Sequence, residues 1–310
     1  MDTLHAARVA RAGLAFLFDP DSAYLRSNLA ARGPVAAFED LVVGGALDPA
    51  MLRPEHRRTA LHDLRSDIVS VLSAATRDGG RVVIPEDPDW PPRLADLAAD
   101  PPEAIPAALC LFVRGNAPLA ATLDRSVTIT GARAATSYGG HIAADLATGC
   151  ADSGWTPVTG GGFGIDTAVL RGALLSGGAT AVLPCGLDRL HPTGNTDLFA
   201  RITENGLLIS VWPPGTLTSR TRFLANFRLL AALTAGTVLV EASLASGTLT
   251  ALREAVRLGR PAMVMPGPVT SAQSAGCHEA LRRYPDVRLV TDAADVLAEL
   301  DTPASATASA

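Results

Sequence analysis

Four glycine-bearing turns hold the residues of this chain whose types and spacing could bind an anion. They are residues 131–137, 159–166, 184–188 and 241–251. Backbone N–H groups left free by such turns, and by the first turn of a following helix, can cradle a phosphate. Arg133 adds a fixed positive charge to the first turn. We therefore expect a phosphate-binding surface built from these turns.

The fourth turn contains the step Ser246-Gly247-Thr248, which opens a helix-like run. Hydroxyl groups and free amides at the start of a helix are suited to holding a phosphate oxygen. Glycine turns end most α/β strands, so each turn alone is a weak signal. Four such turns at one edge of a sheet indicate a phosphate-binding site more specifically than a single turn does.

Two common nucleotide-binding motifs are missing. Residues 160–164 lack the Gly-x-Gly-x-x-Gly register of a dinucleotide fingerprint, and a chain without lysine has no P-loop. The sequence therefore disfavours a nicotinamide dehydrogenase and a motor driven by a nucleoside triphosphate.

No group of residues points to catalysis. Asp166 could act as an acid or base, but an Asp at the start of a helix after a glycine turn is more typical of a helix cap. His141 and His191 accompany no recognisable nucleophile, and no Gly-x-Ser-x-Gly elbow is present. We predict a protein that is not an enzyme and that needs no metal or cofactor.

The turns must be positioned by a parallel sheet. Residues 127–166 read as a strand, a helix from Ser137 to about Cys150 and a second strand, which is a βαβ unit with both turns at one sheet edge. Short apolar runs then alternate with helical patterns, as in a sheet covered on both faces. The expected strands are residues 127–130, 155–158, 180–183, 207–210, 237–240, 262–265 and 287–290.

The first 78 residues have a different pattern. Apolar residues recur at spacings of three and four over residues 6–18, 21–31, 35–41 and 58–75, which predicts short helices. Residues 81–84 are expected to form an edge strand, and residues 110–113 a second strand. The fold class is therefore α/β, with a Rossmann-like doubly wound, mostly parallel sheet preceded by a small all-helical N-terminal domain.

The predicted domains are a helical accessory (SAM-like) domain at 1–78, a Rossmann-like domain at 79–300 and a disordered tail at 301–310. Neither a membrane span nor a signal peptide is supported, so the default location is cytoplasmic. Cys110, Cys150, Cys185 and Cys277 lack metal-ligand spacing and are expected to be reduced, buried thiols.

The net charge of −5 argues against a protein that coats nucleic acid indiscriminately. The charge is unevenly distributed, because residues 201–260 hold seven Arg and three Glu, a local charge of +4 that leaves −9 for the rest. A local basic face is therefore possible. Arginine also suits two-pronged contacts to phosphate.

The order and spacing of several motifs resemble the DNA-processing protein A family (DprA, also called Smf). The resemblance covers about residues 80–300. It rests on residues 85–91, Gly131-Ala132-Arg133, Gly160-Gly161 with Gly164-Ile165-Asp166, Gly186-Leu187-Asp188, Val240-Glu241-Ala242, residues 246–251, Gly259-Arg260 and Pro266-Gly267-Pro268.

The resemblance implies a dimeric single-stranded DNA-binding protein of the cytoplasm. It further implies loading of the RecA recombinase on incoming strands during natural transformation of competent cells. Family members grip the strand through the Arg of the first motif and through the amides and basic residue of the second. The positions carried over are Arg133, Ser137, Gly160, Gly161, Gly164 and Arg228.

Several positions depart from the family pattern. Phe163 stands where the second motif has a basic residue, and Leu170 where a downstream helix has a His. Ser210-Val211 replaces a Ser-Glu pair, and Asn226-Phe227-Arg228 replaces Arg-Asn-Arg. Each lost phosphate contact lowers the salt slope by about 0.7 for a single strand. Phe163 and Phe227 could stack on bases, worth roughly 1–3 kcal/mol per base, or could simply pack in the protein.

Two alternatives stay open. The fold also resembles the phosphoribohydrolases that activate cytokinins, but Ala251 stands where those enzymes carry a catalytic Glu. The chain could also be a diverged paralogue that keeps only protein–protein contacts. The frequent C-terminal winged-helix domain of the family is not expected, because the sheet pattern ends near Leu300.

Overall fold

The structure is a computed structural model that describes residues 3–19, 22–43, 48–53, 56, 61–97 and 109–301. The chain divides into two compact units. The first comprises Met1–Arg114, Cys185–Leu190 and Ile209–Leu217, and the second comprises Gly115–Pro184, His191–Leu208 and Thr218–Ala310. The predicted disordered tail lies outside the described residues, apart from Asp301 at the end of the last helix.

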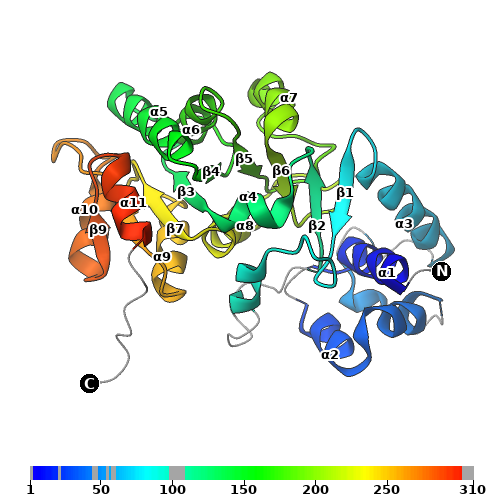
Figure 1. The fold of residues 1–310 in the computed structure, drawn as a ribbon. Coiled ribbons are helices and arrows are strands. Elements are labelled where there is room, and N and C mark those ends of the chain that lie inside the picture. The colour runs from blue at the N-terminus through cyan, green and yellow to red at the C-terminus, as the bar shows by residue number, and fades with distance from the viewer. Residues whose placement is uncertain are drawn as a thin grey trace. The chain divides into compact units, whose positions relative to one another are not determined.

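Helices dominate the first unit (Figure 1). They are α1 (Thr3–Leu17), α2 (Ala23–Phe38), a π-helical turn (Glu39–Val43), a short turn (Pro49–Met51), α3 (Leu61–Ala75) and a 3-10 stretch (Pro92–Leu97). The predicted helices 21–31 and 35–41 are joined in α2, which bends at Gly33, where φ is 74°. Pro34 follows this bend, so its missing N–H costs no interior helical hydrogen bond.

An antiparallel hairpin completes the first unit. Strand β1 (Gly80–Val83) pairs with β2 (Leu111–Arg114), with Val82 opposite Phe112. The acidic residues of the segment after β1 are anchored to arginines of α1, because Arg8 pairs with Asp87 at 2.5 Å and Arg11 with Glu86 at 2.7 Å. Both predicted strands are therefore present, within one or two residues of the expected bounds.

The second unit is a parallel sheet with helices on both faces (Figure 1). Its strands are β3 (Ser126–Thr130), β4 (Thr156–Thr159), β5 (Thr180–Val182), β7 (Gly236–Leu239), β8 (Ala262–Val264) and β9 (Val287–Leu289). They lie side by side in the order β5-β4-β3-β7-β8-β9, and every recorded pairing among them is parallel. Strand β6 (Leu207–Ser210) extends this series beyond β5. The predicted parallel sheet is confirmed.

The helices of this unit follow the strands in sequence. They are α4 (Leu119–Asp124), α5 (Ser137–Asp152), α6 (Ile165–Ala173), α7 (Thr196–Asn205), α8 (Arg220–Leu233), α9 (Leu249–Arg257), α10 (Ala275–Arg283) and α11 (Ala293–Asp301), with a 3-10 turn at Thr193–Asn195. Helices α5, α6 and α11 lie on one face of the sheet, and α8 and α9 on the other (Figure 1). The sheet is therefore doubly wound, as predicted.

Burial explains why these strands form. All five residues of β3 are buried, including the hydroxyl residues Ser126, Thr128 and Thr130. Thr128 satisfies its hydroxyl by donating to the Leu230 carbonyl oxygen at 3.1 Å. Leu239, Val264, Leu252 and Cys277 belong to one apolar cluster from β7, β8, α9 and α10. Full burial of such a side chain contributes about 1.5–3 kcal/mol.

The four cysteines are buried and free, as predicted. Burial raises the pKa of the Cys110, Cys150 and Cys277 thiols to about 12. These groups stay protonated near neutral pH and are poor nucleophiles. Within the described ranges, every helix is too short or too polar to cross a bilayer.

Candidate nucleic-acid interface

The order of the strands reverses between β3 and β7. Strands β4 and β5 continue the sheet on one side of β3, whereas β7, β8 and β9 continue it on the other. In open parallel sheets the crevice outside the carboxyl ends of the strands at such a switch point is the usual ligand site. Arg133 follows β3 and Glu241 follows β7, so both lie at this switch point.

The first turn is clamped to the end of β7. The Ala132 N–H donates to the Glu241 carbonyl oxygen at 2.7 Å, and the Ile165 N–H donates to the Ala132 carbonyl oxygen at 3.1 Å. The Glu241 carboxylate accepts from the Thr136 N–H at 2.9 Å and from the Thr136 hydroxyl at 2.6 Å. Residues 132–136 are therefore held at both ends.

Thr136 is also the N-cap of α5, where its Oγ1 accepts from the Gly139 N–H at 3.1 Å. A Cβ atom on Gly139 would lie 2.3 Å from the Glu241 carboxyl group, so only glycine leaves room for it. The carboxylate of Glu241 thus supplies the negative charge at the N-terminus of α5. We expected the amides at the start of α5 to be free, but some of them donate hydrogen bonds to acceptors within the protein.

The Arg133 side chain is exposed. Its guanidinium carbon lies 6.0 Å from the centre of the Phe223 ring, a half-buried residue of α8. The Phe223 ring also meets His191 edge-on, with centroids 6.1 Å apart. Among the described residues, no carboxylate forms an ion pair with Arg133. An unpaired cation beside an aromatic ring can contact both a phosphate and a base.

The second turn packs directly against the first. Gly164 has φ of 70°, and a Cβ atom there would lie 2.4 Å from the carbonyl oxygens of both Ala132 and Arg133. A side chain at Gly164 would therefore be strained and would also push the two turns apart. The Phe163 and Gly164 N–H groups have no hydrogen-bond acceptor among the described residues.

Asp166 is buried beneath the second turn. Its carboxylate accepts from the Thr130 hydroxyl at 2.8 Å and from the Gly162 N–H at 2.9 Å. Burial raises the pKa of Asp166, and these hydrogen bonds oppose that rise. The prediction of a simple helix cap was wrong, because Asp166 binds the turn and β3, while Gly164 is the N-cap of α6.

Asn195 also stabilises the second turn by hydrogen bonds. Its Nδ2 donates to the carbonyl oxygens of Gly161 and Gly162 at 3.0 and 3.2 Å. Phe163 is left 50% exposed, with the edge of its ring against Gly194. Phe163 therefore packs against its neighbour and still presents apolar surface to solvent. Whether it stacks on a base stays a prediction.

The fourth turn satisfies most of its own polar groups. The Ser246 and Thr248 hydroxyls lie 2.7 Å apart and bond to each other. The first amides of α9, from Thr250 and Ala251, donate to the carbonyl oxygens of Gly247 and Thr248 at 3.0 Å. The hydroxyls and amides that we expected to be free for a phosphate are therefore paired. Gly247 is exposed and lies beneath the ring of Phe227.

Arg228 lies on the exposed surface of α8, but no recorded contact joins it to Arg133. Its charge acts on Glu254 of α9: burial raises the pKa of Glu254, and the charges of Arg228 and Arg260 oppose that rise. Glu254 itself pairs with Arg257. Arg228 thus belongs to the α8–α9 surface rather than to the Arg133 turn.

The other positions singled out in the sequence are partly exposed and partly buried. Ser137 is exposed as the first residue of α5, and Gly160 and Gly161 are buried in the second turn. Leu170, where the family has a His, is fully buried in α6 and contributes to the core. Asn226 is also buried, and its Nδ2 donates to the Val182 carbonyl oxygen at 2.7 Å.

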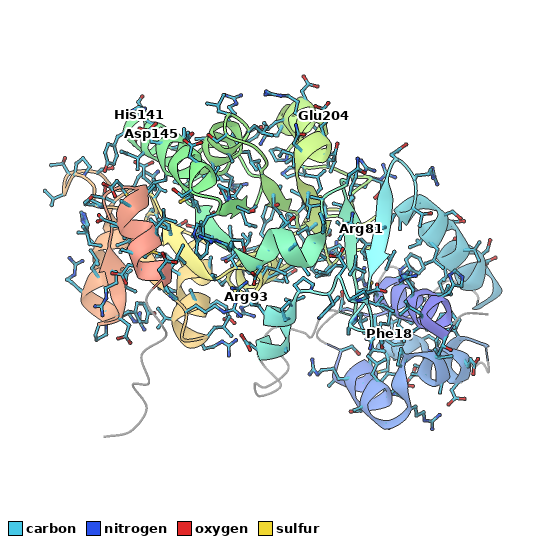
Figure 2. All side chains as sticks on the ribbon, in the orientation of Figure 1. Phe18, Arg81, Arg93, His141, Asp145 and Glu204 are labelled. Carbon is cyan, nitrogen blue, oxygen red and sulfur yellow. The ribbon has the colours of Figure 1, made fainter. Side chains whose placement is uncertain are left out.

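The outer surface of α5 carries a separate pair, His141 and Asp145, which are exposed with 3.2 Å between Nε2 and Oδ2 (Figure 2). This spacing of four residues is an ordinary surface pair on a helix. In the ranges that the structure describes, no three His, Cys, Asp or Glu side chains gather as metal ligands would.

Sequence reasoning missed Glu241, Asn195 and Phe223 as parts of the site. Glu241 was noted within the fourth turn and within a family motif, but not as a partner of the first turn, because that contact joins residues 105 positions apart. Asn195 and Phe223 have no local signal at all. Their roles arise because α8 and the 3-10 turn reach the same sheet edge.

Comparison with known proteins places these features in a family. The sequence model described as DNA recombination-mediator protein A matches residues 81–301. A putative DNA processing protein DprA of Mycobacterium tuberculosis is 38% identical over 284 residues, which cover 90% of this chain and 71% of that protein. DNA processing protein DprA of Streptococcus pneumoniae is 33% identical over 200 residues, covering 64% and 69% of the two chains.

Two solved structures share the fold. DNA processing protein A of Streptococcus pneumoniae superposes with a TM-score of 0.73 at 24% identity, over 96% of this chain and 97% of that one. DNA processing protein A of Helicobacter pylori gives a TM-score of 0.61 at 26% identity, over 72% and 96% of the two chains. A single-stranded DNA binding mode is described for the latter protein.

Proposed function

Because the chain belongs to the DNA recombination-mediator protein A family, as its motifs predicted, we propose that it binds single-stranded DNA at the switch point of its sheet. The observation that carries the proposal is the Arg133 side chain, which is exposed, free of any carboxylate among the described residues, and adjacent to the ring of Phe223. The single-stranded DNA binding mode described for the Helicobacter pylori relative supports it.

Arg133 supplies the electrostatic part of the binding. Its guanidinium group bonds to a phosphate of the strand and releases a counterion, which makes the affinity depend on salt. The turn that carries it is already fixed by Ala132 and Thr136, so little conformational entropy is lost when DNA binds. The Phe163 and Gly164 N–H groups, which have no acceptor in the part of the chain that the structure describes, offer a second contact to the DNA backbone.

Phe163 supplies an apolar part. Half of this side chain is exposed in the turn that packs against the Arg133 turn. A base stacked on an aromatic ring contributes roughly 1–3 kcal/mol and does so with little preference for sequence. A site with one phosphate-binding arginine and one exposed ring therefore binds single strands with less dependence on salt than a strongly basic groove would.

The proposal extends to the role implied by the family resemblance. The chain acts as a homodimer in the cytoplasm, loads the RecA recombinase on incoming single strands, and serves recombination and natural transformation without catalysing a reaction. A pull-down with RecA and sedimentation of the purified chain measure these partners directly. Failure of RecA to associate in the presence of oligonucleotide would remove this extension and leave the DNA-binding proposal intact.

The direct test compares Arg133→Ala with Arg81→Ala. Arg81, a residue of β1 labelled in Figure 2, pairs with Asp89 at 3.4 Å. The Arg81→Ala variant is therefore a matched control that also loses one arginine. Binding of a fluorescent oligothymidylate is measured by anisotropy at several salt concentrations. We expect Arg133→Ala to weaken binding severalfold or more and to reduce the salt slope by about 0.7.

Arg81→Ala should leave both quantities unchanged. An Arg133→Ala protein that is folded by circular dichroism and binds as tightly as the parent chain would overturn the proposed function. Release of free base from a nucleoside monophosphate in the same preparation would instead favour the phosphoribohydrolase-like alternative.

A further inference from the structure

The strongest unassigned feature near the site is the side chain of Glu241, which is 2% exposed yet carries a carboxylate. A buried carboxylate is costly unless hydrogen bonds compensate it. Here the compensation comes from one residue, Thr136, through both its N–H and its hydroxyl. Thr136 is the last residue of the Arg133 turn and the cap of α5.

From this geometry we propose that Glu241 is the positioning residue for Arg133, and that its carboxylate fills an anion site at the N-terminus of α5 from within the protein. The inference rests on the proposed function only for its effect on DNA. The clamp itself is a property of the fold. Glu241 acts through the turn and does not touch the strand.

Three independent contacts converge on this role. The backbone oxygen of Glu241 accepts from Ala132 at one end of the turn, and the side chain accepts from Thr136 at the other. Gly139 leaves the space that the carboxyl group fills, since a Cβ atom there would lie 2.3 Å from it. One residue therefore fixes both ends of a segment whose only exposed cation is Arg133.

The same contacts determine what the α5 terminus does not bind. A helix N-terminus in a crevice at the switch point is the usual place for the phosphate of a mononucleotide. Here an internal carboxylate already holds the Thr136 donors, and its negative charge repels a second anion. Glu241 thus restricts phosphate contact to the Arg133 side chain and the second turn.

The key variant is Glu241→Ala, which removes the carboxylate and leaves a space that a small anion fits. We expect the variant to lose thermal stability and to bind the oligonucleotide several times more weakly. Added formate or acetate should restore both quantities in a saturable manner, relative to chloride at the same ionic strength. The parent chain should show no such response. Rescue by an added carboxylate is a readout that simple loss of packing would not give.

Asp295 offers a matched control. Its Oδ2 accepts from the Thr291 N–H at 2.8 Å and from the Thr291 hydroxyl at 2.7 Å, the same pair of donors, but in an exposed contact between residues four apart at the start of α11. Asp295→Ala should leave oligonucleotide binding unchanged. Glu241→Gln keeps the shape of the side chain and one acceptor, so it should give an intermediate loss and should remain folded if the alanine variant does not.

The outcomes separate the inference from the proposed function. If the parent chain does not bind DNA but formate restores the stability of Glu241→Ala, the clamp stands and the proposed function fails. If the parent chain binds DNA and both Glu241 variants bind equally well, the positioning role is overturned. A stability loss in Glu241→Ala that no carboxylate restores would also overturn the anion-site role.

Discussion

Arg133 of the second unit has a different electrostatic setting from four arginines of the first unit. In the first unit, Arg8, Arg11, Arg32 and Arg81 each pair with an aspartate or glutamate. In the second unit, Arg133 has an aromatic ring beside it and no such partner among the described residues. We infer that DNA binding depends on how many arginines lack an internal anion, rather than on how many arginines a segment contains.

The comparison also applies to the backbone. Gly33 in the first unit and Gly164 in the second have nearly the same φ, 74° and 70°. No atom lies within 4 Å of a Cβ built on Gly33, whereas the carbonyl oxygens of Ala132 and Arg133 would lie 2.4 Å from one on Gly164. The ψ angles differ, at 170° for Gly33 and −119° for Gly164, so a similar positive φ serves a bend in one unit and a close packing of two turns in the other.

The largest effect is expected from Gly164→Ala. An alanine at this positive φ, outside the left-handed helical region, costs about 1–3 kcal/mol of strain, and forcing apart the two packed turns adds about 1–3 kcal/mol. Gly33→Ala should cost only the strain, about 1–3 kcal/mol. Urea unfolding followed by circular dichroism measures both. Equal losses of unfolding free energy in the two variants would show that the contact with the Arg133 turn contributes nothing.

The next effect concerns Phe163. Phe163→Ala should weaken oligonucleotide binding by roughly 1–3 kcal/mol per stacked base and leave the salt slope unchanged, because no charge is lost. Phe163→Arg should steepen the slope by about 0.7. Leu175→Ala is the control, an 80% exposed apolar residue just after α6. Phe163→Ala binding that matches this control would mean that the ring only packs against Gly194.

The smallest effect separates stability from binding in the first unit. Arg11→Ala breaks a two-pronged pair with Glu86, with Nε to Oε2 at 2.9 Å, and should lower the unfolding free energy by about 0.5–1 kcal/mol. Oligonucleotide affinity should not change. Arg133→Ala should show the reverse, with affinity lost and stability kept. Weaker DNA binding by Arg11→Ala would break the comparison, because a paired arginine would then contribute to the interface.

The sequence predicted the fold more completely than the site. Strands such as 127–130 were predictable because a buried parallel strand needs a short, continuous apolar run, and that signal is local. The place of Arg133 after β3 followed from the same signal. The family assignment was confirmed for the same reason, since its motifs lie at strand ends where local sequence is constrained.

The partners of the polar groups could not be predicted. We expected free amides in the turns, but Glu241, Asp166 and neighbouring carbonyl oxygens accept many of them. Which acceptor reaches which amide is decided by the packing of elements far apart in the chain. The position of Arg228 could not be predicted for the same reason, because its place on α8 beside α9 depends on how those two helices pack.

The hydrogen bonds between Thr136 and Glu241 also bear on the order in which the chain folds during synthesis. The two residues are 105 positions apart, so at about 5–20 residues per second a ribosome needs about 5–20 s after Thr136 to add Glu241. Until then the loop with Arg133 lacks the carboxylate and backbone oxygen that fix its ends. A nascent chain can complete β3, α5 and β4 early, yet Arg133, which we propose binds DNA, becomes fixed only after β7 has been made.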